Sequence, residues 1–176
     1  MAVLPVVKFG DPILRKKTEP VTNIQDAVAL ADDMFDTMYE EAGMGLAANQ
    51  IGVSLNFMVV DISQVEGEDG RPLIIINAEI LETHGQADME EGCLSIPDIR
   101  ATITRPAEIV LGYLDEDGEA QEDSFDGLLA RVIQHEVDHL NGVFFTDYLT
   151  PAKRSLINKR LTEISETGAP STGIIL

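Results

Sequence analysis

Apolar residues recur at helical spacing in the first quarter of the chain. Between residues 22 and 42 they fall three or four positions apart and form one stripe, which consists of Ala27, Val28, Ala31, Met34, Phe35, Met38 and Ala42. Thr22, with Gln25 three positions later, resembles a capping box, and Gly43 is a natural C-terminal stop. The pattern therefore predicts an amphipathic helix over residues 22–42.

Short apolar runs follow this helix. Residues 57–62 and 73–77 have the length and composition of buried strands, and a polar loop separates them. Residues 101–103 and 109–114 are also β-like, and the second of these runs ends at a turn that contains Gly118. These four segments predict strands in the middle of the chain.

Helical signals return in the last third of the chain. A second helix is predicted over residues 126–141, where Gly142 stops it. A third begins with Thr150 as its cap and Pro151 at its first position, and its apolar residues are Leu156, Ile157, Leu161 and Ile164. The order helix, strands, helices predicts an α+β domain and not an alternating parallel α/β one. We expect one domain over residues 1–166 and a loose C-terminal tail, residues 167–176, whose apolar end could dock on it.

The composition is that of a soluble globular protein, since 44% of the 176 residues are apolar and 24% are charged. No run of 18 apolar residues occurs, so we expect no membrane span. The N-terminus lacks the features of a secretory signal, which makes the cytoplasm the expected location. The net charge of −19 argues against general nucleic-acid binding, DNA included, because phosphate binding needs a basic surface. A host with high internal salt would account for the acidity.

Two of the three histidines, His135 and His139, lie four positions apart in the second predicted helix. This spacing brings both imidazoles to one helix face, one turn apart, where they can bind one ion. Glu136 follows the first histidine and can act on a water at that ion without being a ligand. The alternative is an amphipathic helix with two surface histidines. The His-Glu-x-x-His pattern alone fits several kinds of metallohydrolase.

A catalytic metal usually has three protein ligands, so a third must lie elsewhere in the chain. One type of protease would have a histidine six positions past His139, but Phe145 stands there. A second type would use a downstream glutamate, for which Glu163 is the candidate. Cys93, the only cysteine, can form no intrachain disulfide, and its thiolate suits a borderline-soft ion, whereas core packing is its alternative role. The residues alone leave both candidates open.

Three segments of the chain form compact motifs: residues 43–50 (GMGLAANQ), residues 91–95 (EGCLS) and residues 134–140 (QHEVDHL). They resemble the three motifs of the peptide deformylase family, the first of which is Gly-x-Gly-Leu-Ala-Ala-x-Gln. They occur in the family's order, and the resemblance covers nearly the whole chain.

This resemblance implies an α+β fold with mixed or antiparallel sheets around a central metal-binding helix, and a metal held by Cys93, His135 and His139. The implied reaction is hydrolysis of the N-formyl group from the N-terminal methionine of newly made proteins, with release of formate. The implied ion is Fe²⁺ in the cell, although Zn²⁺, Co²⁺ or Ni²⁺ would suit the same donors.

The resemblance also implies roles for further residues. Glu136 would be the general base and then the general acid. The side-chain amide of Gln50 and the backbone N–H of Leu94 would donate to the developing oxyanion. The formyl-methionyl nascent peptide could add as a strand beside Gly45 or Glu90. Candidates for the pocket of its methionine side chain, otherwise ordinary core residues, are Met44, Leu128 and Val132.

We also expect specific contacts for the charged residues near these motifs. By resemblance, Glu91 and Arg100 form an ion pair that steadies the segment of Cys93. Arg131 approaches the pocket rim or reaches solvent, and Asp138 either orients an imidazole or lies on the helix surface.

Basic residues are concentrated in the third predicted helix, where four of the 12 fall within eight positions: Lys153, Arg154, Lys159 and Arg160. A solvated helix face is one explanation. The other is docking to the RNA or protein of the ribosome, where a deformylase would meet its substrate.

Two rival functions remain open. A general zinc endopeptidase would use His135, His139 and a downstream glutamate, with Glu136 as its base. A deformylase-like binding module would keep the pocket without catalysis, and intact Glu136, Gln50 and Cys93 weigh against it.

Overall fold

The computed structural model describes residues 2–168. Within them, the helices are α1 (Ile24–Glu40), α2 (Gly127–Leu140) and α3 (Pro151–Thr167), and the short 3-10 helices are η1 (Pro12–Arg15), η2 (Ala48–Ile51) and η3 (Phe145–Tyr148). The strands are β1 (Gly45–Ala47), β2 (Phe57–Val60), β3 (Leu73–His84), β4 (Ala87–Cys93), β5 (Ile96–Arg105), β6 (Glu108–Leu114) and β7 (Ala120–Asp126). The predicted α+β class is confirmed.

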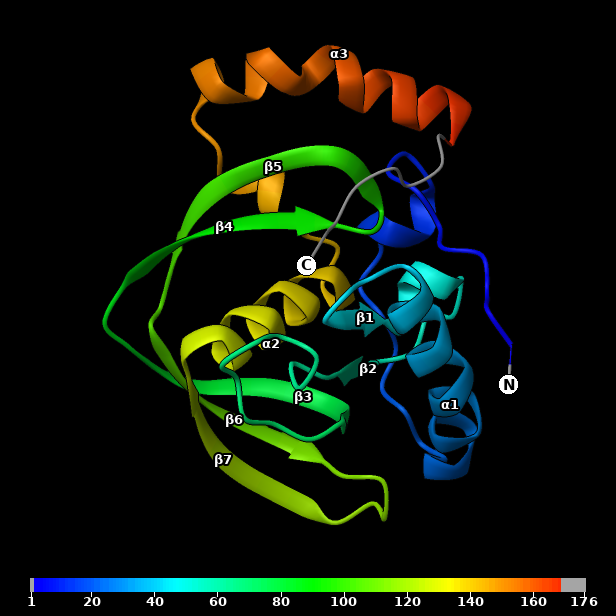
Figure 1. Ribbon diagram of the computed structural model, residues 1–176. Coiled ribbons are helices and arrows are strands. Elements are labelled where there is room, and N and C mark those ends of the chain that lie inside the picture. The colour runs from blue at the N-terminus through cyan, green and yellow to red at the C-terminus, as the bar shows by residue number, and fades with distance from the viewer. Residues whose placement is uncertain (1, 169–176) are drawn as a thin grey trace.

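The strands form two antiparallel sheets. The larger has the order β1-β2-β3-β6-β7, and the smaller consists of the β4–β5 hairpin. Helix α2 passes between the hairpin and the larger sheet, while α3 lies beyond the hairpin, above β5 in Figure 1. This arrangement makes α2 the central helix, as expected from the resemblance.

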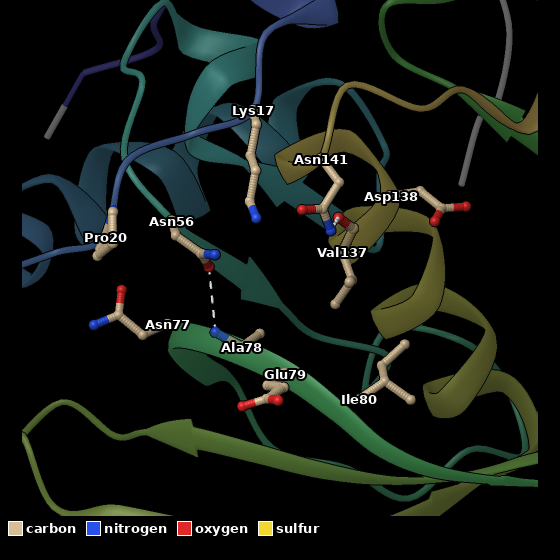
Figure 2. A pocket seen from close by; sticks show the side chains of 10 residues that line it. All are labelled: Lys17, Pro20, Asn56, Asn77, Ala78, Glu79, Ile80, Val137, Asp138 and Asn141. Atoms are coloured by element: carbon tan, nitrogen blue, oxygen red, sulfur yellow. Dashed lines mark hydrogen bonds between the residues drawn. The ribbon is translucent and has the colours of Figure 1, made fainter.

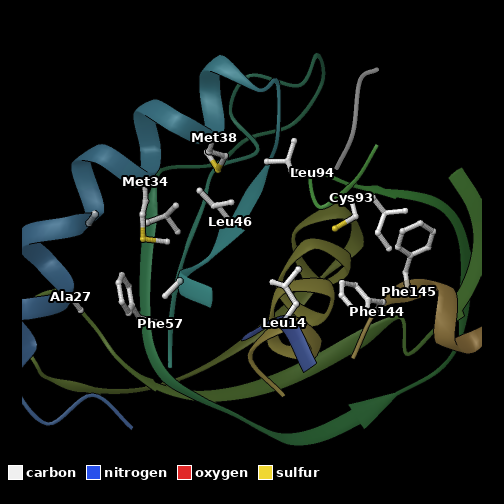
Figure 3. Close-up of a cluster of buried hydrophobic side chains, with 14 of the residues drawn as sticks. Leu14, Ala27, Met34, Met38, Leu46, Phe57, Cys93, Leu94, Phe144 and Phe145 are labelled. Carbon is white, nitrogen blue, oxygen red and sulfur yellow. The ribbon is translucent and has the colours of Figure 1, made fainter. Parts of the chain in front are cut away.

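Strand β2 is buried on both faces because helices cover it from both sides. Side chains alternate along a strand, so Phe57 and Val59 join one buried cluster with α1, whereas Met58 and Val60 join another with α2. The first cluster extends to the β4–β5 hairpin, and Figure 3 shows Cys93 there beside α2, near Leu94 and Phe145. The candidate site thus lies where the hairpin packs on α2.

The first helix is shorter than predicted. Asn23, not Thr22, is its N-cap, because the Asn23 side chain accepts from the backbone N–H of Gln25 at 3.2 Å. The helix ends at Glu40, and Ala42 adopts the left-handed conformation with φ 57°. The N–H of Gly43 donates to the carbonyl of Met38 at 2.8 Å. Gly43 was expected to end the helix, but the left-handed residue that ends it is Ala42, one position earlier.

The other predicted helices are confirmed. Helix α2 begins after Asp126 and stops before Gly142, which has φ 77°. Helix α3 begins as predicted, with the Thr150 hydroxyl accepting from the N–H of Lys153 at 3.3 Å and Pro151 in the first position. It continues through Thr167, the first residue expected in the tail. The expected docking of the tail's end, residues 174–176, lies outside the described residues.

Strands β1, β4 and β7 were not predicted. β1 has only three residues, and β4 and β7 carry many polar side chains because parts of both are exposed. Their hydrogen bonds to β2, β5 and β6 hold them in place, and this pairing does not require apolar side chains. β3 extends well past the predicted residues 73–77, through His84. None of the helices within residues 2–168 is long and apolar enough to cross a membrane.

Candidate metal centre

His135 and His139 lie one turn apart on the buried face of α2, with 3% and 1% of their surface exposed. Their Nε2 atoms are 3.1 Å apart, and the Cys93 Sγ lies 3.0 Å from the His139 Nε2. One donor atom from each of the three residues falls within 4.8 Å of the others. The alternative of two surface histidines is therefore wrong.

Cys93 reaches the histidines because it is the last residue of β4. Leu94 and Ser95 form the turn of the hairpin, which packs against α2 and leaves Cys93 only 1% exposed. One thiolate and two imidazoles fit a borderline-soft divalent ion. The buried His139 Nδ1 and Glu136 Oε2 have no hydrogen-bond partner among the described residues. Glu163, the other candidate ligand, is exposed on α3, 3.5 Å from Arg160, and is not part of this cluster.

Glu91 is the hub of a buried network beside the metal centre. It accepts from His135 Nδ1 at 2.8 Å, from Arg105 Nε at 2.7 Å and from Arg131 Nη1 at 2.8 Å. The predicted partner, Arg100, instead donates to Glu90 at 2.6 Å on the exposed side of the hairpin. The expectation of a Glu91–Arg100 pair is wrong because alternation along β5 turns Arg100 outward and Arg105 inward.

The neighbouring charges on α2 serve this network. Arg131, 3% exposed, does not reach solvent, and it also donates to the backbone carbonyls of Ile103 and Ala87. It thereby ties both strands of the hairpin to α2. Asp138 accepts from Arg105 and from the hydroxyl of Tyr148, each at 2.7 Å. The prediction that it orients an imidazole is therefore wrong, because Asp138 reaches His135 only through Arg105 and Glu91.

The two imidazoles have opposite protonation tendencies. Burial disfavours the charged form of His135, but hydrogen bonds with Cys93 and Glu91 outweigh it and raise the pKa of His135 to about 10. Burial and the charge on His135 hold the pKa of His139 well below its usual range. Burial opposes ionisation of Glu91 too, yet its bonds from His135 and Arg105 keep the pKa of this carboxyl far below its usual range. A metal ion would bind with loss of the proton on His135.

Glu136 and Gly45 face each other between α2 and β1. Glu136 is 2% exposed, and burial raises its pKa to about 7. A Cβ at Gly45 would lie 2.9 Å from the Glu136 Cγ and 2.8 Å from Val132 Cγ1. Glycine is thus needed here for close approach, in addition to any role in turning the chain.

Gln50 and Leu94 flank Cys93. The Gln50 Nε2 lies 3.7 Å from the Cys93 Sγ and 3.1 Å from the Ser95 hydroxyl, while its Oε1 accepts from the N–H of Ala47 at 2.9 Å. Leu94 directly follows Cys93 as the first residue of the hairpin turn. Both predicted oxyanion donors therefore come from segments that contact the thiol.

The three predicted pocket residues belong to one apolar cluster, in which Val132 is buried and the half-buried Met44 and Leu128 pack against it. Met44 also lines a cavity of about 440 Å³ with Tyr39, Gly43 and Val65. Figure 2 shows a different cavity, of about 640 Å³, which none of the three candidate ligands lines; Lys17, Asn56 and Glu79 are on its walls.

Sequence and structure comparisons agree on one family. The family model described as Polypeptide deformylase matches residues 3–155. "Peptide deformylase 2" of Xanthomonas campestris pv. campestris is 47% identical over 169 residues, which cover 93% of this chain and 97% of that protein. The peptide deformylase of Rhizobium meliloti is 44% identical and covers 95% of this chain and 97% of its own length.

Among solved structures, a peptide deformylase from Legionella pneumophila aligns with a TM-score of 0.85 at 40% identity and covers 97% of this chain and 100% of its own. The peptide deformylase of Thermus thermophilus aligns with a TM-score of 0.87 at 35% identity, covering 95% and 100% respectively. Fold, motifs and identity over nearly the full length thus coincide, and the chain belongs to the peptide deformylase family.

Proposed function

We propose that this chain hydrolyses the N-formyl group of formyl-methionyl nascent peptides, with one divalent metal ion held by Cys93, His135 and His139. The observation that carries the proposal is the burial of a thiol and two imidazoles within 4.8 Å of one another, where the hairpin meets α2. Resemblance to the family favours Fe²⁺ in the cell, and Zn²⁺, Co²⁺ and Ni²⁺ suit the same donors. Such an ion, when bound, supplies Lewis acidity that polarises a carbonyl and lowers the pKa of water.

Glu136 is the proton carrier in this proposal. Its carboxylate takes a proton from the water that attacks the formyl carbon, and returns the proton to the departing amine as the carbon–nitrogen bond breaks. A pKa of about 7, raised by burial, suits a group that must be base and acid in turn near neutral pH. The products are formate and a peptide with a free methionine amine.

Gln50 and Leu94 are the proposed oxyanion donors. The Gln50 amide is held by Ala47 and Ser95, so it loses little rotational freedom when it donates to a transition state. Leu94 is the first residue of a two-residue turn, and the pair Cys93–Ile96 that precedes and follows the turn is the last pair of the hairpin. The N–H of Leu94 therefore takes no part in strand pairing and can donate to another acceptor. Fixed donors of this kind typically each contribute about 10²- to 10³-fold in rate.

Strand β1 offers a docking edge for the peptide backbone. β1 is the outermost strand of its sheet, with β2 on one side. The carbonyl of Met44 accepts from the N–H of Asp61 on the β2 side at 2.9 Å, so alternation turns the N–H and C=O of Gly45 away from β2, to the open edge of the sheet. A peptide added there would lie against Glu136, and its methionine side chain could enter among Met44, Leu128 and Val132.

The decisive experiment is formate release from a formyl-Met peptide by protein purified without oxygen, because thiolate-bound iron is easily oxidised. Metal content is measured on the same sample. We expect about one ion per chain and release of formate. Cys93→Ser separates this function from a zinc endopeptidase: it should remove bound metal and activity together, whereas an endopeptidase with Glu163 as ligand would keep both. Metal binding without formate release would favour the binding module.

The basic residues of α3 support a further proposal, docking to the ribosome. Lys153 and Lys159 are exposed, and the apolar Leu156 between them is 83% exposed. Arg154 and Arg160 are less available to bind a partner, because they already form ion pairs with Asp147 and Asp98 respectively. Replacing all four basic residues by Gln should weaken co-sedimentation with ribosomes and spare activity on short formyl peptides. Unchanged co-sedimentation would refute docking through these residues. Such a partner would place the enzyme in the cytoplasm.

A further inference from the structure

A segment near the N-terminus joins the two chain segments that carry Gln50 and Cys93. The N–H of Val7 donates to the carbonyl of Gln50 at 2.7 Å, and the N–H of Phe9 donates to the carbonyl of Ser95 at 2.8 Å. We call residues 7–9 the strap. Because its two ends hold η2 and the turn of the hairpin, the strap fixes their separation at the point where both approach the metal centre.

Lys8, in the middle of the strap, makes the third link. Its Nζ donates to the carbonyl of Leu94 at 3.1 Å, across 86 positions of sequence. The two carbonyls of the hairpin turn, those of Leu94 and Ser95, are therefore both bound by the strap. With the carbonyl of Leu94 fixed, the turn has little freedom to rotate the N–H of that residue or to displace the neighbouring thiol.

The surroundings of Lys8 indicate that this side chain does more than fill space. The side chain is half-buried, and burial lowers the pKa of the amine, although Glu41 and Cys93 favour its charged form. Lysine is seldom buried without a partner, because desolvation of an ammonium is costly. A neutral side chain of similar length would fill the same space, so packing alone does not account for a lysine beside the thiol.

We propose that Lys8 is a positioning residue for the deformylase reaction. Its bond to the Leu94 carbonyl fixes the hairpin turn, which aims the Leu94 N–H at the developing oxyanion and holds the neighbouring Cys93 sulfur in place. The inference rests on the proposed function, since it assumes that the Leu94 N–H is an oxyanion donor. Lys8 itself touches neither substrate nor metal in this scheme. It acts through the turn, where small errors in donor placement reduce the rate.

The test compares Lys8→Met, which removes the charge and the donor, with Lys8→Arg, which keeps both. Lys16→Met is the matched control, because it makes the same charge change at an exposed position of the same N-terminal region. Each full-length protein is loaded with Co²⁺. The measurements are kcat and KM on a formyl-Met peptide, the thiolate-to-Co²⁺ charge-transfer absorption, the bound cobalt and the Tm.

We expect Lys8→Met to lower kcat about 10-fold, less than outright removal of an oxyanion donor, with KM changed less than about twofold. The charge-transfer band should shift, while bound cobalt and Tm stay close to those of Lys16→Met. Lys8→Arg should restore most of kcat and the original band.

Two results would overturn the proposal. One is a Lys8→Met protein whose kcat and band match those of Lys16→Met. The other is a loss of kcat that follows a loss of bound cobalt or of Tm, which would assign Lys8 a purely structural role. If the unsubstituted protein releases no formate, the proposed function fails instead. The charge-transfer band still reports on Lys8 in that case, and an unshifted band would then refute its effect on the position of the Cys93 sulfur.

Discussion

Replacing Glu91 by Gln should be the most damaging conservative change near the metal centre. Glu91 is fully buried and accepts hydrogen bonds from His135, Arg105 and Arg131. Glutamine keeps the size of the side chain but removes the negative charge and replaces one acceptor oxygen by a donor. The guanidinium groups of Arg105 and Arg131 would then lose the counter-ion that they share. The NH₂ group of the glutamine would also face at least one of the N–H donors that now bind Glu91, so that two donors would lie opposite each other.

The expected magnitude follows from this burial. Removal of one partner from a buried ion pair costs about 3–5 kcal/mol, because an uncompensated charge is left behind. For a chain of this size each kcal/mol lowers Tm by about 2–4 °C, so the Tm of Glu91→Gln should fall by roughly 6–20 °C. His135 would also lose the acceptor that orients its ring, and loss of such an outer partner typically weakens metal binding by about 10- to 100-fold.

Glu90→Gln is the control that the neighbouring position offers. Glu90 pairs with Arg100 at 2.6 Å, as short as the Glu91 contacts, but its side chain is 60% exposed. An exposed pair contributes only about 0–1 kcal/mol. The assay is thermal unfolding with and without Co²⁺, together with a competition titration for metal affinity. Equal losses of Tm in the two variants, or unchanged metal affinity in Glu91→Gln, would refute the assignment of Glu91 as the support of His135.

Three further changes, the second with Gly112→Ala as its control, test other parts of the molecule. Glu136→Gln should lower kcat about 10²- to 10⁴-fold with bound metal unchanged, and an unaltered rate of formate release would assign proton transfer elsewhere. Gly45→Ala should cost about 1–3 kcal/mol in urea unfolding and lower kcat/KM, because its methyl would lie 2.8 Å from Val132 Cγ1. Gly112→Ala, 3.3 Å from a flexible leucine, should be nearly neutral. Asp147→Asn should destabilise the protein at pH 7, with the difference shrinking as the pH falls from the ordinary carboxyl pKa of 3.8 through the lowered one, so that urea unfolding shows a smaller difference at about pH 3 than at pH 7.

The sign of that pH dependence follows from the contacts of Asp147. Burial opposes its ionisation, but hydrogen bonds from Arg15 and from the N–H of Phe144 outweigh this and lower the pKa of the carboxyl. A lowered pKa means that the folded state binds the proton less readily than the unfolded state, so the contribution to stability is present above 3.8 and lost as the pH falls through the lowered value. An asparagine has no such titration.

Residues close together in the sequence were sufficient to predict the central helix and the placement of its two histidines on one face. The four-residue spacing of His135 and His139 and the stop at Gly142 depend only on residues close in sequence, and α2 has the predicted position. The thiol could not be assigned in this way. Cys93 lies 42 positions before His135 and reaches it through the packing of a hairpin on α2, so only the resemblance of the surrounding motif selected it over Glu163.

The partner of Glu91 shows where inference from the sequence failed. Arg100 and Arg105 are both on β5, and which of them faces inward depends on the register of the hairpin. Glu91 pairs with Ala101, and the register shifts between Glu91 and Cys93. A shift of one residue moves every side chain to the opposite face, and nothing local to β4 or β5 determines it. The alternation of Ile99, Ile103 and Arg105 along β5 could have favoured Arg105, had the full length of β5 been recognised.

The charge distribution around the site also depends on the fold. The chain has a net charge of −19, yet three of its 12 basic residues, Lys8, Arg105 and Arg131, come from separate parts of the sequence and bind Leu94 or Glu91, which adjoin the metal ligands. Salt screens the exposed carboxylates beyond about 8 Å, whereas buried or half-buried cations are screened much less. Arg105 and Arg131 share the buried Glu91, and Arg105 also binds Asp138, so the charges beside the metal centre are balanced locally, while the acidic surface contributes little to the potential there. The net charge therefore describes the surface of this protein and gives little information about its active site.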